Sequence, residues 1–289
     1  SVCGTITPTL RRQRPLHYIM YPLATLDPIP GLDHRLELYT HPLDDDLVSH
    51  KLHQQRRWEP FESQLWLASL GEGDVVLDVG ANLGYYSVLS ACAPVSALRV
   101  FAFEPDPDNF QLLCANIEKN RAQASVVAMH VALGDSSGDV PLHLSSSNKG
   151  DHQLFSTDQA RDSVLVSMLR GEDAISEQVD RIDLVKIDTQ GTELAVLEGL
   201  WPMLLKSRSR VRLLVELTPF SLRAAGASGA QLIERLSRLD LPFAIVDHVE
   251  HQIAPSSADA LMEWCRNVDS DPSDEGFMNI FVGAPPKLS

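Results

Sequence analysis

Short apolar runs alternate with amphipathic segments along most of this chain of 289 residues. The run at 74–79 reads DVVLDV and is followed by Gly80, and the segments between such runs repeat their apolar residues at helical spacing. Alternation of this kind is typical of a parallel sheet with helical crossovers. We therefore predict an α/β fold with a doubly wound, seven-stranded, mostly parallel sheet, whose strands lie at 74–79, 99–103, 125–131, 183–187, 212–215, 243–246 and 279–282.

Two stretches depart from this alternation. Residues 1–57 carry prolines at positions 8, 15, 22, 28, 30 and 42, which exclude long helices and central strands, so we predict an irregular N-terminal cap region. Residues 58–289 then form the α/β domain. Within it, 138–168 has two strand-type runs around a polar loop, which predicts a β insertion after the third strand that serves as a lid or binding segment.

The charge balance argues against two classes of partner. Lys and Arg number 24 against 39 Asp and Glu, for a formal net charge of −15. Such a surface repels nucleic-acid phosphates and anionic lipids, so we expect neither as a partner. The chain lacks an apolar stretch long enough for a membrane helix and the apolar core of a signal peptide, and we expect a soluble, cytoplasmic protein. Its four cysteines lie far apart, which favours free thiols.

The ends of the first two predicted strands carry residues typical of nucleoside binding. Gly80 and Gly84 allow a tight turn and close approach of a ligand, and Glu104, after the second strand, can accept hydrogen bonds from both hydroxyls of a ribose. The alternative is that the glycines only close a turn and that Glu104 is a surface carboxylate. A nicotinamide-dependent oxidoreductase is disfavoured, because the glycine spacing is wrong and Tyr85 and Tyr86 add bulk where a pyrophosphate would lie.

These strand ends resemble the motifs of the FkbM-type class I S-adenosylmethionine-dependent methyltransferases. The resemblance runs from about Trp58 to the C-terminus, and Gln190 stands where the family often has Glu, so we assign no general-base role to that position. The motifs that carry it are 58–60 (WEP) followed by Glu62, 73–87 (GDVVLDVGANLGYYS), 103–105 (FEP), 132–135 (ALGD) and, most specifically, 186–193 (KIDTQGTE) with 196–199 (VLEG).

The resemblance implies a Rossmann-like class I methyltransferase fold. It also implies methyl transfer from S-adenosylmethionine, which yields S-adenosylhomocysteine, to a hydroxyl of a small molecule such as a sugar, polyketide or other secondary metabolite. Glu104 would hold the ribose, Asn109 or the turn at 133–135 the adenine, and nearby carboxylates would steady the sulfonium. The expected cofactor-binding residues are Asp78, Gly80, Ala81, Asn82, Gly84, Tyr85, Tyr86, Ser87, Glu104, Pro105, Asn109, Leu133, Gly134, Asp135 and Asp188.

Methyl transfer to a hydroxyl also needs a group that accepts the hydroxyl proton. Asp188, at the end of the fourth strand, is the first candidate, and its alternative role is to cap the following turn. Glu216, at the end of the fifth strand, could hold a divalent metal together with Asp188, which is possible but not expected. His152, in the polar insertion, could reach over the cleft as a base or simply be solvated.

Two other functions stay open at this point. One is a non-catalytic nucleoside-binding protein with a Rossmann-like fold, whose signs would be a broken glycine turn or a missing Asp188, and neither is seen. The other is an N-methyltransferase that acts on a small-molecule amine. The sequence names neither the acceptor nor the oligomeric state, because 1–57 and the insertion match no informative pattern.

Overall fold

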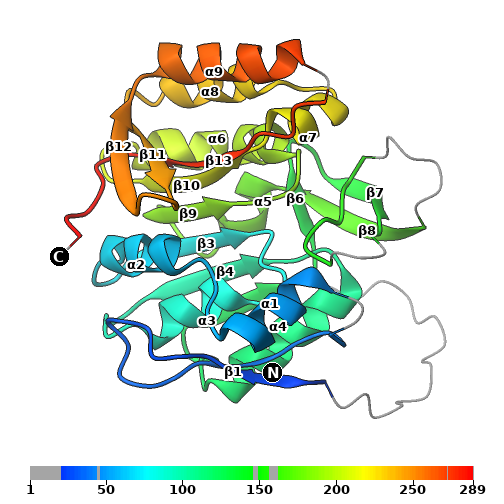
Figure 1. Ribbon diagram of the computed structural model, residues 1–289, viewed down its shortest axis with the longest axis vertical. Helices are drawn as coiled ribbons and strands as arrows, with labels where there is room; N and C mark the ends of the chain where they lie inside the picture. The colour runs from blue at the N-terminus through cyan, green and yellow to red at the C-terminus, as the bar shows by residue number, and fades with distance from the viewer. Residues whose placement is uncertain (1–20, 44–45, 146–148, 156–161, 272, 289) are drawn as a thin grey trace.

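An eight-stranded sheet forms the centre of the structure, a computed structural model that describes residues 21–43, 46–145, 149–155, 162–271 and 273–288 (Figure 1). Neighbouring strands follow the order β12-β11-β13-β10-β9-β3-β4-β5, with parallel pairing from β10 to β5 and antiparallel pairing among β10, β13, β11 and β12. The strands are β3 (Val75–Val79), β4 (Arg99–Phe103), β5 (Val126–Met129), β9 (Leu184–Ile187), β10 (Arg212–Leu217), β11 (Phe243–Asp247), β12 (Gln252–Ser256) and β13 (Met278–Val282).

The predicted doubly wound, mostly parallel α/β sheet is confirmed, and the predicted number of seven strands is one too few. The additional strand, β12, forms a hairpin with β11 at the edge of the sheet. It contains Pro255, which lacks the N–H that a central strand needs but is tolerated at a sheet edge. The proline and the polar ends of this segment hide its strand character in the sequence.

Helices cover both faces of the sheet. Successive residues of β3 therefore join different cores, with Val75, Leu77 and Val79 packed in one buried cluster and Val76 in the other. A strand covered on both faces must be apolar throughout, which is the pattern that made β3 recognisable. The helices are α1 (Leu47–Gln55), α2 (Pro60–Ser69), α3 (Tyr85–Cys92), α4 (Pro107–Lys119), α5 (Gly171–Ile175), α6 (Glu193–Ser207), α7 (Pro219–Ala224), α8 (Gly229–Ser237) and α9 (Ala258–Ser270).

The predicted β insertion forms part of a second sheet. β6 (Ala132–Gly134), β8 (Ser163–Arg170) and β7 (Gly138–His143) pair in that order, and β7 and β8 project beyond the main sheet on the side of its carboxyl ends (Figure 1). Part of the loop between β7 and β8, at 146–148 and 156–161, lies outside the described residues. The lid role of the insertion stays a prediction.

The prediction of an irregular N-terminal region is wrong for its described part. β1 (Leu23–Thr25) pairs with β2 (Glu37–Tyr39), and α1 follows. The side-chain amide of Asn116 on α4 bonds both the N–H and the carbonyl of Tyr39, which fixes β2 to the helix. All three elements are short and lie between the prolines, so the proline argument excluded long elements without excluding these. Residues 1–20 are outside the described part.

Two smaller expectations can also be compared with the structure. Within the described ranges, helices are all too short or too polar to cross a membrane. The cytoplasmic location stays a prediction.

Cys92 and Cys265 are free thiols as expected, whereas Cys114 is disulfide-bonded, so the expectation of free thiols is wrong at that position.

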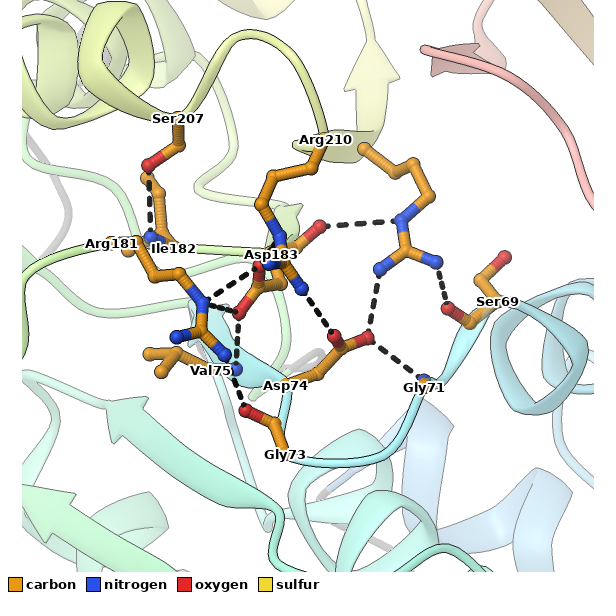
Figure 2. Close-up of polar contacts among 11 residues, drawn as sticks. Ser69, Gly71, Gly73, Asp74, Val75, Arg181, Ile182, Asp183, Ser207 and Arg210 are labelled. Carbon is orange, nitrogen blue, oxygen red and sulfur yellow. Dashed lines mark hydrogen bonds and ion pairs between the residues drawn. The ribbon is translucent and has the colours of Figure 1, made fainter.

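A buried polar network ties the strands together at their amino-terminal ends (Figure 2). Asp183, which is fully buried, accepts a 2.8 Å hydrogen bond from the N–H of Val75 and forms ion pairs with Arg181 and Arg210. Asp74 also forms an ion pair with Arg210. The residue before β3 and the residue before β9 are thereby held in one network, which fixes the register of these two neighbouring strands.

We expect Asp183→Ala to lower the free energy of unfolding by about 3 kcal/mol, because the buried N–H of Val75 and two arginines lose their partner. Urea denaturation followed by circular dichroism measures this change. The matched control is Asp180→Ala, whose side chain is 99% exposed, and which should change the free energy by less than about 0.5 kcal/mol. Equal stability of the two variants would contradict a structural role of the network.

Candidate active site

A cavity of about 370 Å³ lies at the carboxyl ends of β9, β3 and β4, the edge where open parallel sheets bind ligands. Its wall is completed by α1, by the β6–β8–β7 sheet and by the segment at 149–154. Thirteen of the residues predicted from the sequence line this one cavity: Asp78, Gly80, Ala81, Asn82, Tyr85, Tyr86, Glu104, Pro105, Asn109, Leu133, His152, Asp188 and Glu216.

Gly80 sits where β3 and β9 approach most closely. Its φ is +83°, and a Cβ built on it would lie 1.9 Å from the carbonyl oxygen of Asp188. A side chain is therefore excluded at this position by contact as well as by backbone conformation. The absence of a side chain lets the turn after β3 and the end of β9 form one continuous floor of the cavity.

Asn82 presents a polar atom that the protein itself leaves unused. It also has a left-handed backbone, with φ of +52°, and its Oδ1 is buried with no hydrogen-bond partner among the described residues. A buried acceptor without a partner is costly unless a ligand satisfies it. Because Asn82 lines the cavity, its Oδ1 is available to a bound molecule with a hydroxyl or ammonium donor.

Glu104 is almost completely buried at the end of β4. Its two carboxylate oxygens accept hydrogen bonds from the backbone N–H groups of Asn82, at 2.7 Å, and of Asp106, at 2.9 Å. Burial raises the pKa of Glu104 to about 8, against the lowering effect of these bonds. The Asn109 side chain also forms a hydrogen bond to this carboxylate, and the acceptor capacity that remains is available to a ribose hydroxyl.

Lys186 is a site residue that the sequence reasoning quoted in a motif but assigned no role. Its buried Nζ lies 2.6 Å from Asp188 Oδ2 and 4.9 Å from the ring centre of Tyr86. Burial alone would lower the pKa of this lysine, but the charges of Asp188, Glu59 and Asp78 raise it. A lysine inside an apolar strand run is itself a signal, because a buried ammonium needs carboxylate partners.

Glu59 is the second residue that the sequence reasoning quoted in a motif but assigned no role. It precedes α2, and its Oε2 accepts a 2.6 Å hydrogen bond from the hydroxyl of Tyr86. Burial raises the pKa of Glu59, with Lys186 acting in the opposite direction. The sequence places Glu59 far from the strand-end motifs, and only the packing of α2 against α3 brings it to the cavity.

Four predicted cofactor-binding residues do not line the cavity. Ser87 is fully buried in α3 and donates a 2.7 Å hydrogen bond to Asp78, so it supports a cavity residue instead of facing a ligand. Gly84 packs against α4. Gly134 packs against α6, where a Cβ on Gly199 would lie 1.9 Å from its carbonyl oxygen, and Asp135 is exposed. A short turn cannot aim every residue at one ligand, which is why these neighbours of site residues point elsewhere.

His152 and Asn109 lie at the β4 side of the cavity. Asp106 Oδ1 is 3.9 Å from His152 Nε2, while Nδ1 accepts from the N–H of Ser145. Burial lowers the pKa of His152, and the charge of Asp106 opposes this. The Asn109 side chain bonds His41, the carbonyl of Lys149 and the Glu104 carboxylate, so it supports Glu104 at the edge of the cavity. His152 Nε2 is buried at the cavity without a hydrogen-bond partner among the described residues, and the role of His152 as the base stays a prediction.

Asp188 and Glu216 come together as predicted, but an amide lies between them. Gln190 Nε2 donates 2.9 Å hydrogen bonds to Asp188 Oδ1 and to Glu216 Oε2. Lys186 bonds the other oxygen of Asp188. Hydrogen-bond donors therefore occupy the positions on the carboxylates at which a metal ion would bind. The described residues contain no group of three or more His, Cys, Asp or Glu side chains that could hold a metal ion. This arrangement does not fit the metal that the sequence left open.

The family model for the methyltransferase FkbM domain matches residues 78–243, more than half of the chain. The chain belongs to this family. The predicted resemblance is thereby confirmed, and the motif residues at the ends of β3, β4 and β9 fall within the match, whereas Glu59 and α1 lie outside it.

Individual relatives are similar in sequence to part of the chain. The hexuronic acid methyltransferase AglP of Haloferax volcanii is 35% identical over 139 residues, which cover 47% of this chain and 54% of the relative. The methyltransferase sdnD of Sordaria araneosa is 26% identical, over 46% of this chain and 62% of the relative. The chain thus spans between half and two-thirds of the length of these relatives. A crystal structure titled methyltransferase FkbM, from Methylobacillus flagellatus, matches at 14% identity and a TM-score of 0.46, over 74% of this chain and 44% of that one.

We expect Glu104→Gln to weaken S-adenosylhomocysteine binding about tenfold or more, because a charge-assisted acceptor for the ribose hydroxyls is lost. Glutamine keeps the shape and one acceptor oxygen, so the turn is disturbed less than by alanine. Calorimetric titration measures the affinity, and Asp135→Ala, at the exposed position, is the control that should leave it unchanged.

The same binding should depend on pH in a defined direction. The ionised form of Glu104 is the better acceptor and its pKa is about 8, so affinity should rise as the pH increases through that value. The Glu104→Gln variant should lack this rise. A rise of equal size in both proteins would assign it to another group.

Proposed function

We propose that the protein transfers a methyl group from S-adenosylmethionine to a hydroxyl of a small-molecule acceptor. The observation that carries this proposal is the cavity at the strand ends, where the Gly80 turn, Glu104 and Asp188 of the family motifs meet. The reaction class, the cofactor and the acceptor are all part of the proposal, because the chain spans only part of the length of the relatives that it matches.

The cavity residues fit the proposed cofactor in charge and in hydrogen bonding. The turn at 80–82 would hold its methionine part, Glu104 would accept from the ribose hydroxyls, and the unpartnered Asn82 Oδ1 offers an acceptor to a donor of the ligand. When bound, S-adenosylmethionine supplies a methyl group on a positively charged sulfur. Asp78, Glu59 and Asp188 outnumber the single ammonium of Lys186, so a cation at this floor is favoured electrostatically.

Two lysines in the lining of the cavity favour a hydroxylated acceptor that also carries a negative charge. Lys51 on α1 and Lys149 line the cavity, and the Lys51 ammonium lies 5.9 Å from the ring centre of Trp58. Indole rings provide a surface for the apolar face of a sugar, and an ammonium can bind a sugar carboxylate. The name of the relative AglP, a hexuronic acid methyltransferase, supports a sugar acid. A small molecule is thus a better proposal for the partner than nucleic acid or a membrane.

Two alternatives are less well supported. A non-catalytic nucleoside-binding protein would not need the ordered set of Lys186, Asp188 and Glu216 beside the nucleoside site. An N-methyltransferase would have to hold its amine acceptor neutral, whereas a floor of buried carboxylates stabilises the protonated, non-nucleophilic form.

We expect S-adenosylmethionine and S-adenosylhomocysteine to raise the melting temperature, because a ligand that binds only the folded state stabilises it by mass action. NAD and NADP should leave it unchanged. Differential scanning fluorimetry makes the comparison. Stabilisation by NAD and none by S-adenosylhomocysteine would overturn the cofactor assignment.

We expect an aryl glucuronide to be methylated more efficiently than the matching aryl glucoside, because only the glucuronide offers a carboxylate to Lys51. Lys51→Gln should reduce kcat/KM for the glucuronide about tenfold and for the glucoside little, since a charge-assisted hydrogen bond is worth roughly 1.5–3 kcal/mol. Mass-spectrometric detection of the methylated product gives both rates. Lys119→Gln, on α4 beside Glu37, is the surface control.

A further inference from the structure

Asp188 and Glu216 are held as a pair by a single side chain. They end the adjacent parallel strands β9 and β10, and the Gln190 amide donates to one oxygen of each, at 2.9 Å. Gln190 itself has a left-handed backbone, with φ of +55°. The turn that carries it is fixed by Glu193, whose carboxylate accepts from the N–H groups of Thr189 and Gly191. The amide is therefore presented from a rigid turn between the two carboxyl groups.

The two carboxyl groups of the pair differ in their partners. Asp188 receives hydrogen bonds on both oxygens, from Lys186 at 2.6 Å and from Gln190. Burial alone would raise the pKa of Asp188, but Lys186, Gln190 and a hydrogen bond with Glu216 hold it below its ordinary value. Asp188 is thus a weak base whose oxygens are already engaged. Lys186 bonds Asp188 and not Glu216, and the described hydrogen bonds of Glu216 are those with the Gln190 amide and with Asp188.

We propose, on the basis of the function proposed above, that Glu216 takes up the proton of the acceptor hydroxyl, with Gln190 as its positioning residue and Asp188 as a fixed anion. In this step the hydroxyl oxygen forms a bond to the methyl carbon, the carbon–sulfur bond breaks, and its electron pair stays on the sulfur. The hydroxyl proton goes to the Glu216 carboxylate. Charge balances, because the sulfonium and the carboxylate become a neutral thioether and a neutral carboxylic acid.

The surroundings of Glu216 make it a stronger base than an ordinary glutamate. Burial, and then the negative charges of Asp188 and Glu193, raise the pKa of Glu216 well above its ordinary value. Lys186 opposes this, Glu59 adds to it, and the neighbour on β13 is the uncharged Asn279. Two close carboxyl groups cannot both ionise easily, so the pair holds one proton at low pH and releases it, from Glu216, as the pH rises. Turnover should therefore increase with pH through the pKa of Glu216.

Three substitutions test this assignment on the aryl glucuronide and on S-adenosylhomocysteine binding. Glu216→Gln should reduce kcat by about 10²-fold or more with cofactor affinity nearly unchanged. Asp188→Asn removes a charge that raises the Glu216 pKa, so it should keep measurable turnover and shift the rise in rate to lower pH. Gln190→Ala removes the bridging donor, so the rise should shift to higher pH. Glu234→Gln, on the surface of α8, is the matched control.

A second measurement does not depend on the acceptor. In the S-adenosylhomocysteine complex, the difference between the infrared spectra of the wild type and of Glu216→Gln at neutral pH should contain the band of one protonated carboxylic acid, over the bands that Glu104 and other buried acids give in both proteins. The corresponding band of Glu216 in Asp188→Asn should disappear at lower pH than in the wild type. This measurement decides the case if the glucuronide is a poor substrate or if Glu216→Gln folds badly.

Several results would overturn the assignment. Near-normal turnover in Glu216→Gln would show that Glu216 is not the base. If Asp188→Asn then lost turnover at every pH, Asp188 would be the base. An infrared band that is the same in Glu216→Gln as in the wild type would contradict the protonation of Glu216. Failure of the wild type to bind S-adenosylhomocysteine would instead refute the proposed function, so the two failures are distinguishable.

Discussion

The parallel pairing of β3 with β9 determines where the polar side chains of the cavity lie. At the amino-terminal end, Asp183 bonds the N–H of Val75. At the carboxyl end, Val79 is in register with Ile187, and the backbones after these residues come so close that only glycine fits at position 80. A slip of this pairing by one residue would turn every side chain of the strand to the other face. The polar network in Figure 2 therefore acts on the site from the opposite end of the sheet.

That close pairing also concentrates negative charge in a place with little water. Asp78 and Asp188 come from the two strands, Glu59 is added from α2, and Lys186 is the ammonium among them. Burial of one ammonium with three carboxyl groups is stable only if some of the acids stay protonated or a cation binds. The raised pKa of Asp78 and of Glu59 favours their protonated forms. A positively charged ligand would instead stabilise the ionised forms.

The sequence was most informative where residues repeat with a period and least informative where distant segments meet. The strand ends could be predicted because apolar runs end at Gly80, Glu104 and Asp188, which share one edge of any parallel sheet. The same reasoning extended too far along each turn, to Gly134 and Asp135, because neighbours in a turn point in different directions. β12 was missed because a short edge strand with a proline has no buried apolar pattern. Glu59 stands in a quoted motif, but its place at the cavity was missed because that place depends on how α2 packs, which has no local signal.

The cavity is divided between residues inside and outside the part of the chain that the family model matches. The glycine turn, Glu104 and Asp188 lie within 78–243 and form the side proposed for the cofactor. The opposite wall includes side chains from α1, the segment before α2 and the segment before β13, with Lys51, Trp58 and Phe277 among them. A shared cofactor requires the first set to vary little, whereas each acceptor requires its own second set. Family membership therefore supports the reaction class, whereas the acceptor site that we propose includes an N-terminal region whose sequence has no recognisable pattern but whose short elements are fixed to α4.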